Sequence, residues 1–264
     1  MTTHETSSSE PCKSLQWDSE FFGRRIGRIE AQRLDAQLIQ KIYSWSKENA
    51  VECLYFAADL SHPPTVRLAE DHGFHLMEVR LTFERKLQDW QPGPIPRAYL
   101  DVVIREAQPE DVPAMQAIAG ISYTTTHFIV DPCFPPGRGR AFYETWVKNS
   151  CAGYEDMVLA AEAGGEVIGF LTARFLAERR GDIRPECQLM LIGIKSGARR
   201  KGIGLEMLRS GIDWLVRKGG SERVTGVVQA QNTPILRSLE RLGFASCSAQ
   251  LFYHKWFTDY EKPA

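Results

Sequence analysis

The segment that most constrains the fold occurs twice in the chain. Residues 62–86, "HPPTVRLAEDHGFHLMEVRLTFERK", align without a gap with residues 232–256, "NTPILRSLERLGFASCSAQLFYHKW". The matched positions are Pro64 with Pro234, Arg67 with Arg237, Glu70 with Glu240, Gly73 with Gly243, Phe74 with Phe244, and Leu81 with Leu251. Proline in the first turn of a helix and glycine just after the last turn are the expected end signals. Each copy therefore predicts a helix followed by a strand, and the gapless register indicates a duplicated unit.

A proline-rich stretch, "QDWQPGPIPRA", separates the two copies. Pro92, Pro94 and Pro96 remove backbone donors and disfavour helical conformation in the residues before them. Neither a helix nor a central strand can continue through such a stretch. We therefore predict a truncated N-terminal domain at residues 1–90, a linker at residues 91–99 and a second domain at residues 100–264.

The second half carries the fuller pattern of elements. Its expected elements are strand Val102–Arg105, a helix opening at "QPEDVPAM", helix Gly139–Ser150, two strands around a Gly164–Gly165 turn, strand Gln188–Ile194, helix Ile203–Lys218, strand Arg223–Gln229, helix Thr233–Leu242 and strand Cys247–Trp256. The first half predicts strand Ile26–Glu30, helix Asp35–Asn49 and strand Cys53–Ala58 before its repeated unit. This alternation predicts an α/β fold with a mixed sheet.

Composition excludes several classes of protein. A hydrophobic share of 43% and a charged share of 25% are ordinary for a globular protein, and the formal net charge of -1 predicts no nucleic-acid partner. The polar N-terminus is no secretory signal, and no apolar run is long enough to span a bilayer, so we predict a cytoplasmic protein without a membrane partner. The six cysteines form no C-x-x-C pair and the histidines show no H-E-x-x-H spacing, so we predict no metal and reduced thiols.

The stretch "GIKSGARRKGIG", residues 193–204, places three basic residues between glycines ahead of a predicted helix. Two common phosphate loops fail here, because Ile203–Gly204 stand where a Walker loop needs Lys and Ser/Thr, and Met207 stands where a dinucleotide fingerprint needs a small residue. The helix start still offers free N–H groups and a positive dipole end. We therefore predict a pyrophosphate seat; the alternative is a solvated basic turn with a capping glycine.

The strand before this loop has Gly193 in its middle, which predicts a bulge or a close approach of backbone. A bulged strand would leave N–H and C=O groups for an extended ligand. A ligand with a pyrophosphate at a helix start and an amide-bearing arm along a strand is coenzyme A.

The pattern Ile194-x-Ser196-x-x-Arg199-x-x-Gly202-x-Gly204 resembles the acyl-CoA signature of the GNAT superfamily of N-acyltransferases. Ser196 replaces a common proline of that signature. The resemblance covers most of residues 102–256 and implies the GNAT fold, acetyl-CoA as co-substrate and acetyl transfer to a primary amine. It implies that these residues bind the cofactor: Ile192, Gly193, Ile194, Arg199, Arg200, Lys201, Gly202, Ile203, Gly204 and Asn232.

A narrower resemblance comes from the layout of the whole chain. "LQWDSEFFGRRIGRIE", the truncated first half and "GRAFYETWVKNS" look like the dTDP-fucosamine acetyltransferase family. That resemblance implies a nucleotide-linked amino sugar as acceptor. The alternatives are another small-molecule amine, a protein amine, or an acyl-CoA sensor without catalysis. The sequence leaves open whether the chain forms a homodimer.

The general acid of the GNAT superfamily, a tyrosine in the last helix, is replaced here by Leu239. Leucine cannot donate a proton, and Leu239 fits an apolar stripe with Ile235 and Leu242. The substitute catalytic candidates are Glu186, Tyr253 and His127. Each has a plainer role, as a solvated loop glutamate, a packed strand aromatic, or a residue that lines the acceptor pocket.

Two loops are candidates for binding the acceptor. One is Tyr123–Arg140, and the other is "AERRGDIRPE", whose Arg179, Arg180 and Arg184 suit the phosphates of a sugar nucleotide. Surface arginines are commonly solvated, which is the alternative for these three.

Overall fold

The computed structural model describes residues 10–91, 101–176, 186–218 and 221–257. They belong to two compact units. Unit 1 comprises Met1–Val79, Asp131–Pro135 and Ala249–Ala264, and unit 2 comprises Arg80–Val130 and Pro136–Ser248. The predicted division at residues 91–99 differs from these bounds, because the first change between units falls at Val79/Arg80 and two later segments return to unit 1.

An exchange of strands explains this difference. Strand β4 (His75–Lys86) is the strand of the first copy of the repeat, yet it pairs antiparallel with β9 (Arg223–Gln229) of unit 2. Strand β10 (Ala245–Trp256) is the strand of the second copy, yet it pairs antiparallel with β3 (Cys53–Asp59) of unit 1. Each copy therefore supplies a strand to the sheet of the other copy, which a single boundary in the sequence cannot describe.

Unit 1 contains four strands in the order β1-β2-β3-β10, in which β2 and β3 run parallel. Besides β3 and β10, its elements are β1 (Cys12–Ser14), α1 (Gln16–Phe22), β2 (Ile26–Ile29), α2 (Ala36–Glu48) and α3 (Pro63–Asp71). The short elements β1 and α1 were not predicted. Asp35 caps α2 by accepting a bond from the Leu38 N–H at 2.7 Å.

Unit 2 contains the strand order β4-β9-β8-β7-β6-β5, antiparallel except for the parallel pair β8 and β9. Besides β4 and β9, its elements are β5 (Val102–Glu106), α4 (Val112–Ser122), α5 (His127–Val130), α6 (Arg138–Asn149), β6 (Met157–Ala163), β7 (Glu166–Phe175), β8 (Cys187–Ile194), α7 (Ile203–Lys218) and α8 (Thr233–Arg241). The predicted α/β class with a mixed sheet is confirmed. Gly164 and Gly165 both have positive φ, at 59° and 79°, as a two-residue hairpin turn requires.

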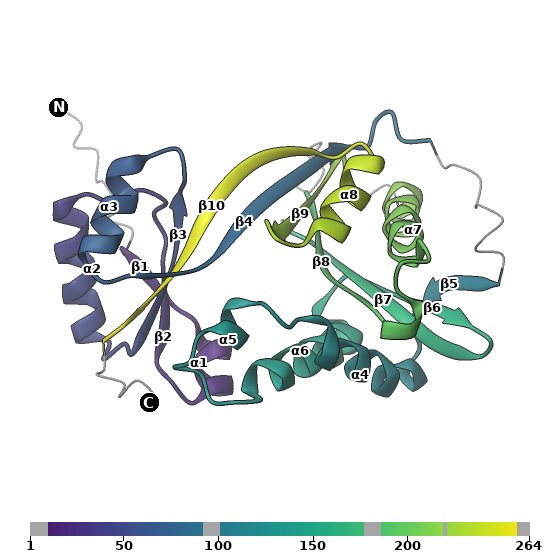
Figure 1. The fold of residues 1–264 in the computed structure, drawn as a ribbon, viewed down its shortest axis with the longest axis horizontal. Coiled ribbons are helices and arrows are strands. Elements are labelled where there is room, and N and C mark those ends of the chain that lie inside the picture. Colours follow the sequence, from purple (N-terminus) through teal and green to yellow (C-terminus); the bar gives the residue numbers. More distant parts are fainter. Residues whose placement is uncertain (1–9, 92–100, 177–185, 219–220, 258–264) are drawn as a thin grey trace, which may run out of the picture. The chain divides into compact units, whose positions relative to one another are not determined.

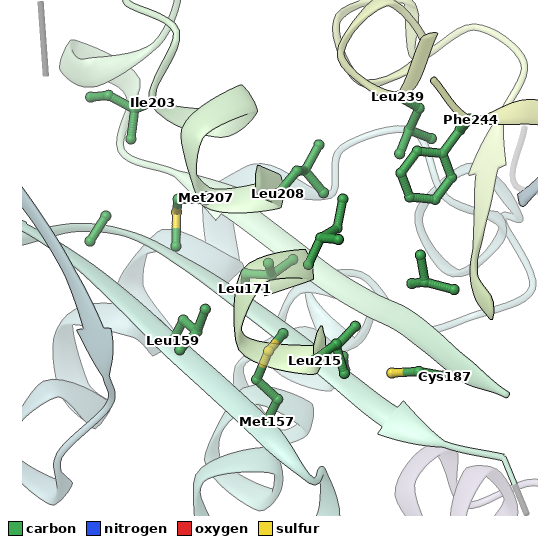
Figure 2. Close-up of a cluster of buried hydrophobic side chains, with 14 of the residues drawn as sticks. Met157, Leu159, Leu171, Cys187, Ile203, Met207, Leu208, Leu215, Leu239 and Phe244 are labelled. Carbon is green, nitrogen blue, oxygen red and sulfur yellow. The ribbon is translucent and has the colours of Figure 1, made fainter. Parts of the chain in front are cut away.

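Helices cover both faces of the unit 2 sheet, with α4 and α6 on one side and α7 and α8 on the other (Figure 1). The buried face of α7 contributes Met207, Leu208 and Leu215 to a core that includes Leu159 and Leu171 of the sheet (Figure 2). This packing leaves the first turn of α7 at the end of β8, where the basic loop lies.

The two copies of the repeat have matching backbone hydrogen bonds. Phe74 N–H donates to the carbonyl of Ala69 at 2.9 Å, and Phe244 N–H donates to that of Leu239 at 3.0 Å. Gly73 and Gly243 both end their helix with positive φ, at 69° and 75°. The predicted helix–glycine–strand unit therefore forms twice. In the part of the chain that the structure describes, no helix is long and apolar enough to cross a bilayer.

Candidate active site

Strands β8 and β9 separate soon after they begin. Among the described residues they pair only over Cys187–Leu189 and Val224–Gly226. The N–H of Lys195 donates to the carbonyl of Ile168 at 2.8 Å, which places the backbone groups of residue 195 on the β7 side. Because successive residues alternate, the backbone groups of Ile192 and Ile194 face the side that β9 has left. We call residues 190–194 of β8, on that side, the β8 edge.

A bulge in β8 lies where the two strands part. Leu171 pairs with Ile192 and Ala173 pairs with Leu189, so Met190 and Leu191 together face Thr172. The Leu191 N–H donates to the Thr172 hydroxyl at 3.1 Å. The predicted bulge therefore exists, but it precedes Gly193, which pairs in register with Phe170.

Close packing accounts for Gly193. A Cβ at this position would lie 2.5 Å from Cε1 of Phe170 and 3.0 Å from Cγ2 of Ile118 on α4. We expect Gly193→Ala to lower the free energy of unfolding by about 1–3 kcal/mol, since overpacking forces neighbours out of place. Urea unfolding of the variant measures this loss, and a midpoint equal to that of the wild type would contradict the packing role.

The basic loop ends in a helix start with free donors. The N–H of Glu206 bonds to the Gly202 carbonyl at 3.1 Å, so the N–H groups of Ile203, Gly204 and Leu205 precede the first intrahelical bond of α7. Arg200 and Gly202 have positive φ, at 62° and 80°. Together the free N–H groups and the helix dipole make a site suited to an anion.

Gly204 has no packing reason to be glycine. A Cβ there would meet only Cγ1 of Ile194, at 3.9 Å, and its φ is not positive. Glycine in a helix costs about 0.5–1 kcal/mol relative to alanine. A residue that weakens the helix without relieving a clash fits a position where a ligand approaches the backbone closely.

Charge around the helix start is mainly positive. Arg200 and Lys201 are exposed, while Arg199 donates from Nε to the carbonyl of Ile194 at 2.9 Å. The carboxylate of Glu206, in the first turn of α7, forms an ion pair with Arg209. This ion pair offsets the negative charge nearest to the predicted pyrophosphate seat.

The start of α8 lies at the end of the neighbouring strand. Asn232 is exposed and precedes the first turn of α8, and its N–H donates to the Gln229 carbonyl at 2.9 Å. Helices α7 and α8 thus begin after the carboxyl ends of β8 and β9, the two parallel strands that part. Ligands of α/β sheets bind at such places.

Tyr123 and Thr125 begin the Tyr123–Arg140 loop that was predicted to bind the acceptor, but the sequence did not predict that they and Gln229 lie beside the β8 edge. The hydroxyl of Tyr123 donates to the Ile192 carbonyl at 3.0 Å, on the β8 edge. Gln229, the last residue of β9, donates from Nε2 to the Thr125 carbonyl at 2.9 Å. The sequence indicates this location only by position: Tyr123 and Thr125 come just after a helix, and Gln229 ends a strand.

The three catalytic candidates lie in different surroundings. Glu186 accepts bonds through both carboxylate oxygens, from Arg223 at 2.5 Å and from Thr225 at 2.8 Å. His127 is buried on α5, with its ring 3.7 Å from that of Phe128. Tyr253 belongs to unit 1 and packs in its core, where its ring stacks on Phe56. The structure therefore places Glu186 and His127 in the unit that carries the basic loop, and Tyr253 in the other unit.

Leu239 is a core residue. Its side chain is 1% exposed, and it lies beside Phe244 at the end of α8 (Figure 2). This confirms the packing role that its spacing predicted. The arginines at 179, 180 and 184 lie outside the described residues.

Comparisons with known proteins identify a family for the residues around the basic loop. Residues 124–244 match the model of the Acetyltransferase (GNAT) family, a range that contains the β8 edge, the basic loop and α8. Residues 124–244 form a GNAT acetyltransferase domain. GNAT proteins use acetyl-CoA as co-substrate, in agreement with the sequence prediction.

Solved GNAT structures confirm the expected fold. A GCN5-related N-acetyltransferase from Sphaerobacter thermophilus superposes with a TM-score of 0.64, covering 93% of this chain and 76% of its own, at 17% identity.

Two curated relatives share sequence with the chain. The spore coat polysaccharide biosynthesis protein SpsD of Bacillus subtilis is 28% identical over 152 residues, which are 56% of this chain and 49% of SpsD. The mycothiol acetyltransferase of Salinispora arenicola is 25% identical over 241 residues, which are 87% of this chain and 68% of that protein. The chain thus spans about half the length of SpsD.

Proposed function

We propose that this protein transfers an acetyl group from acetyl-CoA to the primary amine of a small molecule. The observation that carries the proposal is Gly204, a glycine without a packing role at a helix start whose N–H groups are free. An adjacent strand edge presents further backbone groups, as an extended amide-bearing ligand requires. The start of α7 thus suits the diphosphate of acetyl-CoA, and the β8 edge suits the amide-bearing arm that leads to the thioester.

Each part of the site has a separate task in this proposal. The N–H groups of Ile203, Gly204 and Leu205, with Arg200 and Lys201, hold the diphosphate. The N–H groups of Ile192 and Ile194 are donors for carbonyl groups along the arm. Acetyl-CoA supplies a thioester carbonyl that is open to attack by a neutral amine.

Position 239 holds leucine instead of the tyrosine that would act as general acid. We propose Glu186 and His127 as the side chains of unit 2 that take the proton from the amine, directly or through water. Leu239 is buried in the core and cannot donate a proton. We therefore expect much of the rate to come from holding the two substrates in place.

A thiol-release assay tests the proposed activity. Purified protein with acetyl-CoA is supplied with a panel of amines, and free CoA is measured against a control without enzyme. Release that depends on an amine supports transfer. Calorimetric binding of acetyl-CoA without release for any amine would favour an acyl-CoA sensor, which the loss of the tyrosine at 239 also suggests. An absence of binding would refute both.

For the acceptor we propose a nucleotide-linked amino sugar. The support is the similarity to SpsD, whose name places it in polysaccharide biosynthesis, and the arginine-rich sequence at residues 179–184. The amine panel therefore includes dTDP- and UDP-linked amino sugars, the free amino sugars, polyamines and amino acids. Equal rates with free and nucleotide-linked sugars would refute recognition of the nucleotide.

The arginines give a second test of the acceptor. Replacing Arg179, Arg180 and Arg184 together by serine is expected to raise the KM for a nucleotide sugar about tenfold or more, since charge-assisted bonds to phosphate contribute roughly 1.5–3 kcal/mol. The affinity for acetyl-CoA should not change, and calorimetry checks it. An unchanged acceptor KM would contradict the assignment.

A further inference from the structure

We propose that Tyr123 is a positioning residue of the acetyl-donor site, which holds the Ile192 peptide of the β8 edge through its hydroxyl. The inference rests on the proposed function, because it assigns Tyr123 to the strand along which acetyl-CoA would bind. Tyr123 does not replace the general-acid tyrosine that is absent at position 239; its proposed role is to hold the backbone.

The hydroxyl of Tyr123 takes a place that a strand would otherwise fill. β9 pairs with β8 only as far as Leu189, so the Ile192 carbonyl has lost the partner that a continuing sheet would supply. The Tyr123 hydroxyl donates to that carbonyl at 3.0 Å. Buried backbone carbonyls normally accept a hydrogen bond. Here the donor is the side chain of Tyr123, the residue that follows α4.

The ring of Tyr123 is held firmly. It follows directly after α4 and stacks on Tyr143 of α6, with 4.2 Å between ring centroids and an angle of 18°. Burial, and then the neighbouring Tyr143, raise the pKa of Tyr123 well above its ordinary value. The hydroxyl therefore remains a neutral donor across the pH range in which enzymes of this kind operate.

Two residues further on, the same segment holds the other strand. The hydroxyl of Thr125 donates to Oε1 of Gln229 at 3.1 Å, and the Gln229 amide donates to the Thr125 carbonyl at 2.9 Å. Residues 123–125 thus bond to β8 through one end and to β9 through the other. This bridge fixes the two strands where they part, and it sets the direction of the Ile192 and Ile194 N–H groups.

The variant Tyr123→Phe tests the role, because it removes the hydroxyl and keeps the stacked ring. Its first readout is the amide nitrogen resonance of Gly193, which belongs to the peptide whose carbonyl Tyr123 holds. We expect this resonance to shift in the ligand-free variant. We also expect the Kd for acetyl-CoA to rise about two- to tenfold, the effect of one lost hydrogen bond.

A matched control removes a similar bond elsewhere. Tyr43 bonds through its hydroxyl to Nδ1 of His72 at 2.9 Å in unit 1, so Tyr43→Phe also deletes one tyrosine hydroxyl. This variant should leave both the Gly193 resonance and the Kd for acetyl-CoA unchanged.

The outcomes separate this inference from the proposed function. Wild-type protein that binds acetyl-CoA, with Tyr123→Phe that binds equally well, would overturn the role of Tyr123 alone. A lower kcat with an unchanged Kd and an altered pH profile would overturn it in favour of proton donation. Wild-type protein that does not bind acetyl-CoA would overturn both proposals.

Discussion

Replacing Gly204 by alanine is expected to make the protein more stable and less able to bind acetyl-CoA. Alanine removes the cost of glycine in a helix, and its Cβ would meet only Ile194, at 3.9 Å, so the free energy of unfolding should rise by about 0.5–1 kcal/mol. The same methyl group would stand between the backbone and the diphosphate. Loss of a charge-assisted bond there should weaken binding roughly tenfold or more.

Calorimetry with acetyl-CoA and urea unfolding measure the two opposite effects of Gly204→Ala. Gly197→Ala is the control, because Gly197 lies in the same loop and an added Cβ has no protein atom within 4 Å. It occupies a position of the signature that is not fixed, so it should bind acetyl-CoA as the wild type does. Equal affinity of both variants would show that no ligand approaches Gly204 closely.

Replacing Asp131 by alanine is expected to destabilise the protein by about 1–3 kcal/mol or more, the cost of removing one partner of buried hydrogen bonds. The Oδ2 atom of Asp131 lies 2.5 Å from Nδ1 of His254 and accepts from the Trp256 indole at 2.9 Å. The side chains of His254 and Asp131 are 0% and 2% exposed. Loss of the carboxylate would remove the acceptor that the His254 and Trp256 side chains share.

Acid should have a related effect on the wild type. Burial raises the pKa of Asp131, but bonds from His254, Trp256 and the Cys133 N–H outweigh it and lower the pKa overall. A carboxyl whose folded pKa is lowered stabilises the fold above its unfolded pKa, about 3.9, and loses that contribution as the pH falls through the folded value. Stability in the wild type should therefore fall below about pH 4, and Asp131→Ala should lose this part of the dependence.

Thermal unfolding between pH 3 and pH 7 measures both effects. Asp89→Ala is the control, since the Asp89 side chain is 82% exposed and lies 3.9 Å from Arg85. Exposed pairs contribute about 0–1 kcal/mol. A loss for Asp131→Ala as small as for this control would contradict the buried pair.

Periodicity and end signals predicted most elements because those signals are local. Helix α7 and strand β9 begin and end where the sequence placed them, at Ile203–Lys218 and Arg223–Gln229. The stripe that made Leu239 a core residue was equally local, and its burial follows.

The remainder of the site depends on contacts between distant segments. Tyr123 lies far from Ile192 in sequence, so its role as a donor to that carbonyl has no local signal. Gly193 predicted a bulge or a close approach of backbone, but the side chains of Phe170 and Ile118 account for this glycine, and the bulge lies earlier in the strand. The exchange of β4 and β10 was hidden for the same reason, since partners in a sheet are chosen by the folded chain.

That exchange makes the first copy of the repeat a structural part of unit 2, because it supplies β4 to the sheet of that unit. A chain without the first copy would lack β4, so the edge of β9 that β4 covers at residues 223–229 would be open to pairing with other chains, although β8 would still pair with Val224–Gly226. Mutations in the first copy that displace β4 are therefore expected to lower the rate of the proposed acetyl transfer, although the mutated residues do not contact a substrate. We therefore expect selection on unit 2 to preserve the first copy of the repeat as well.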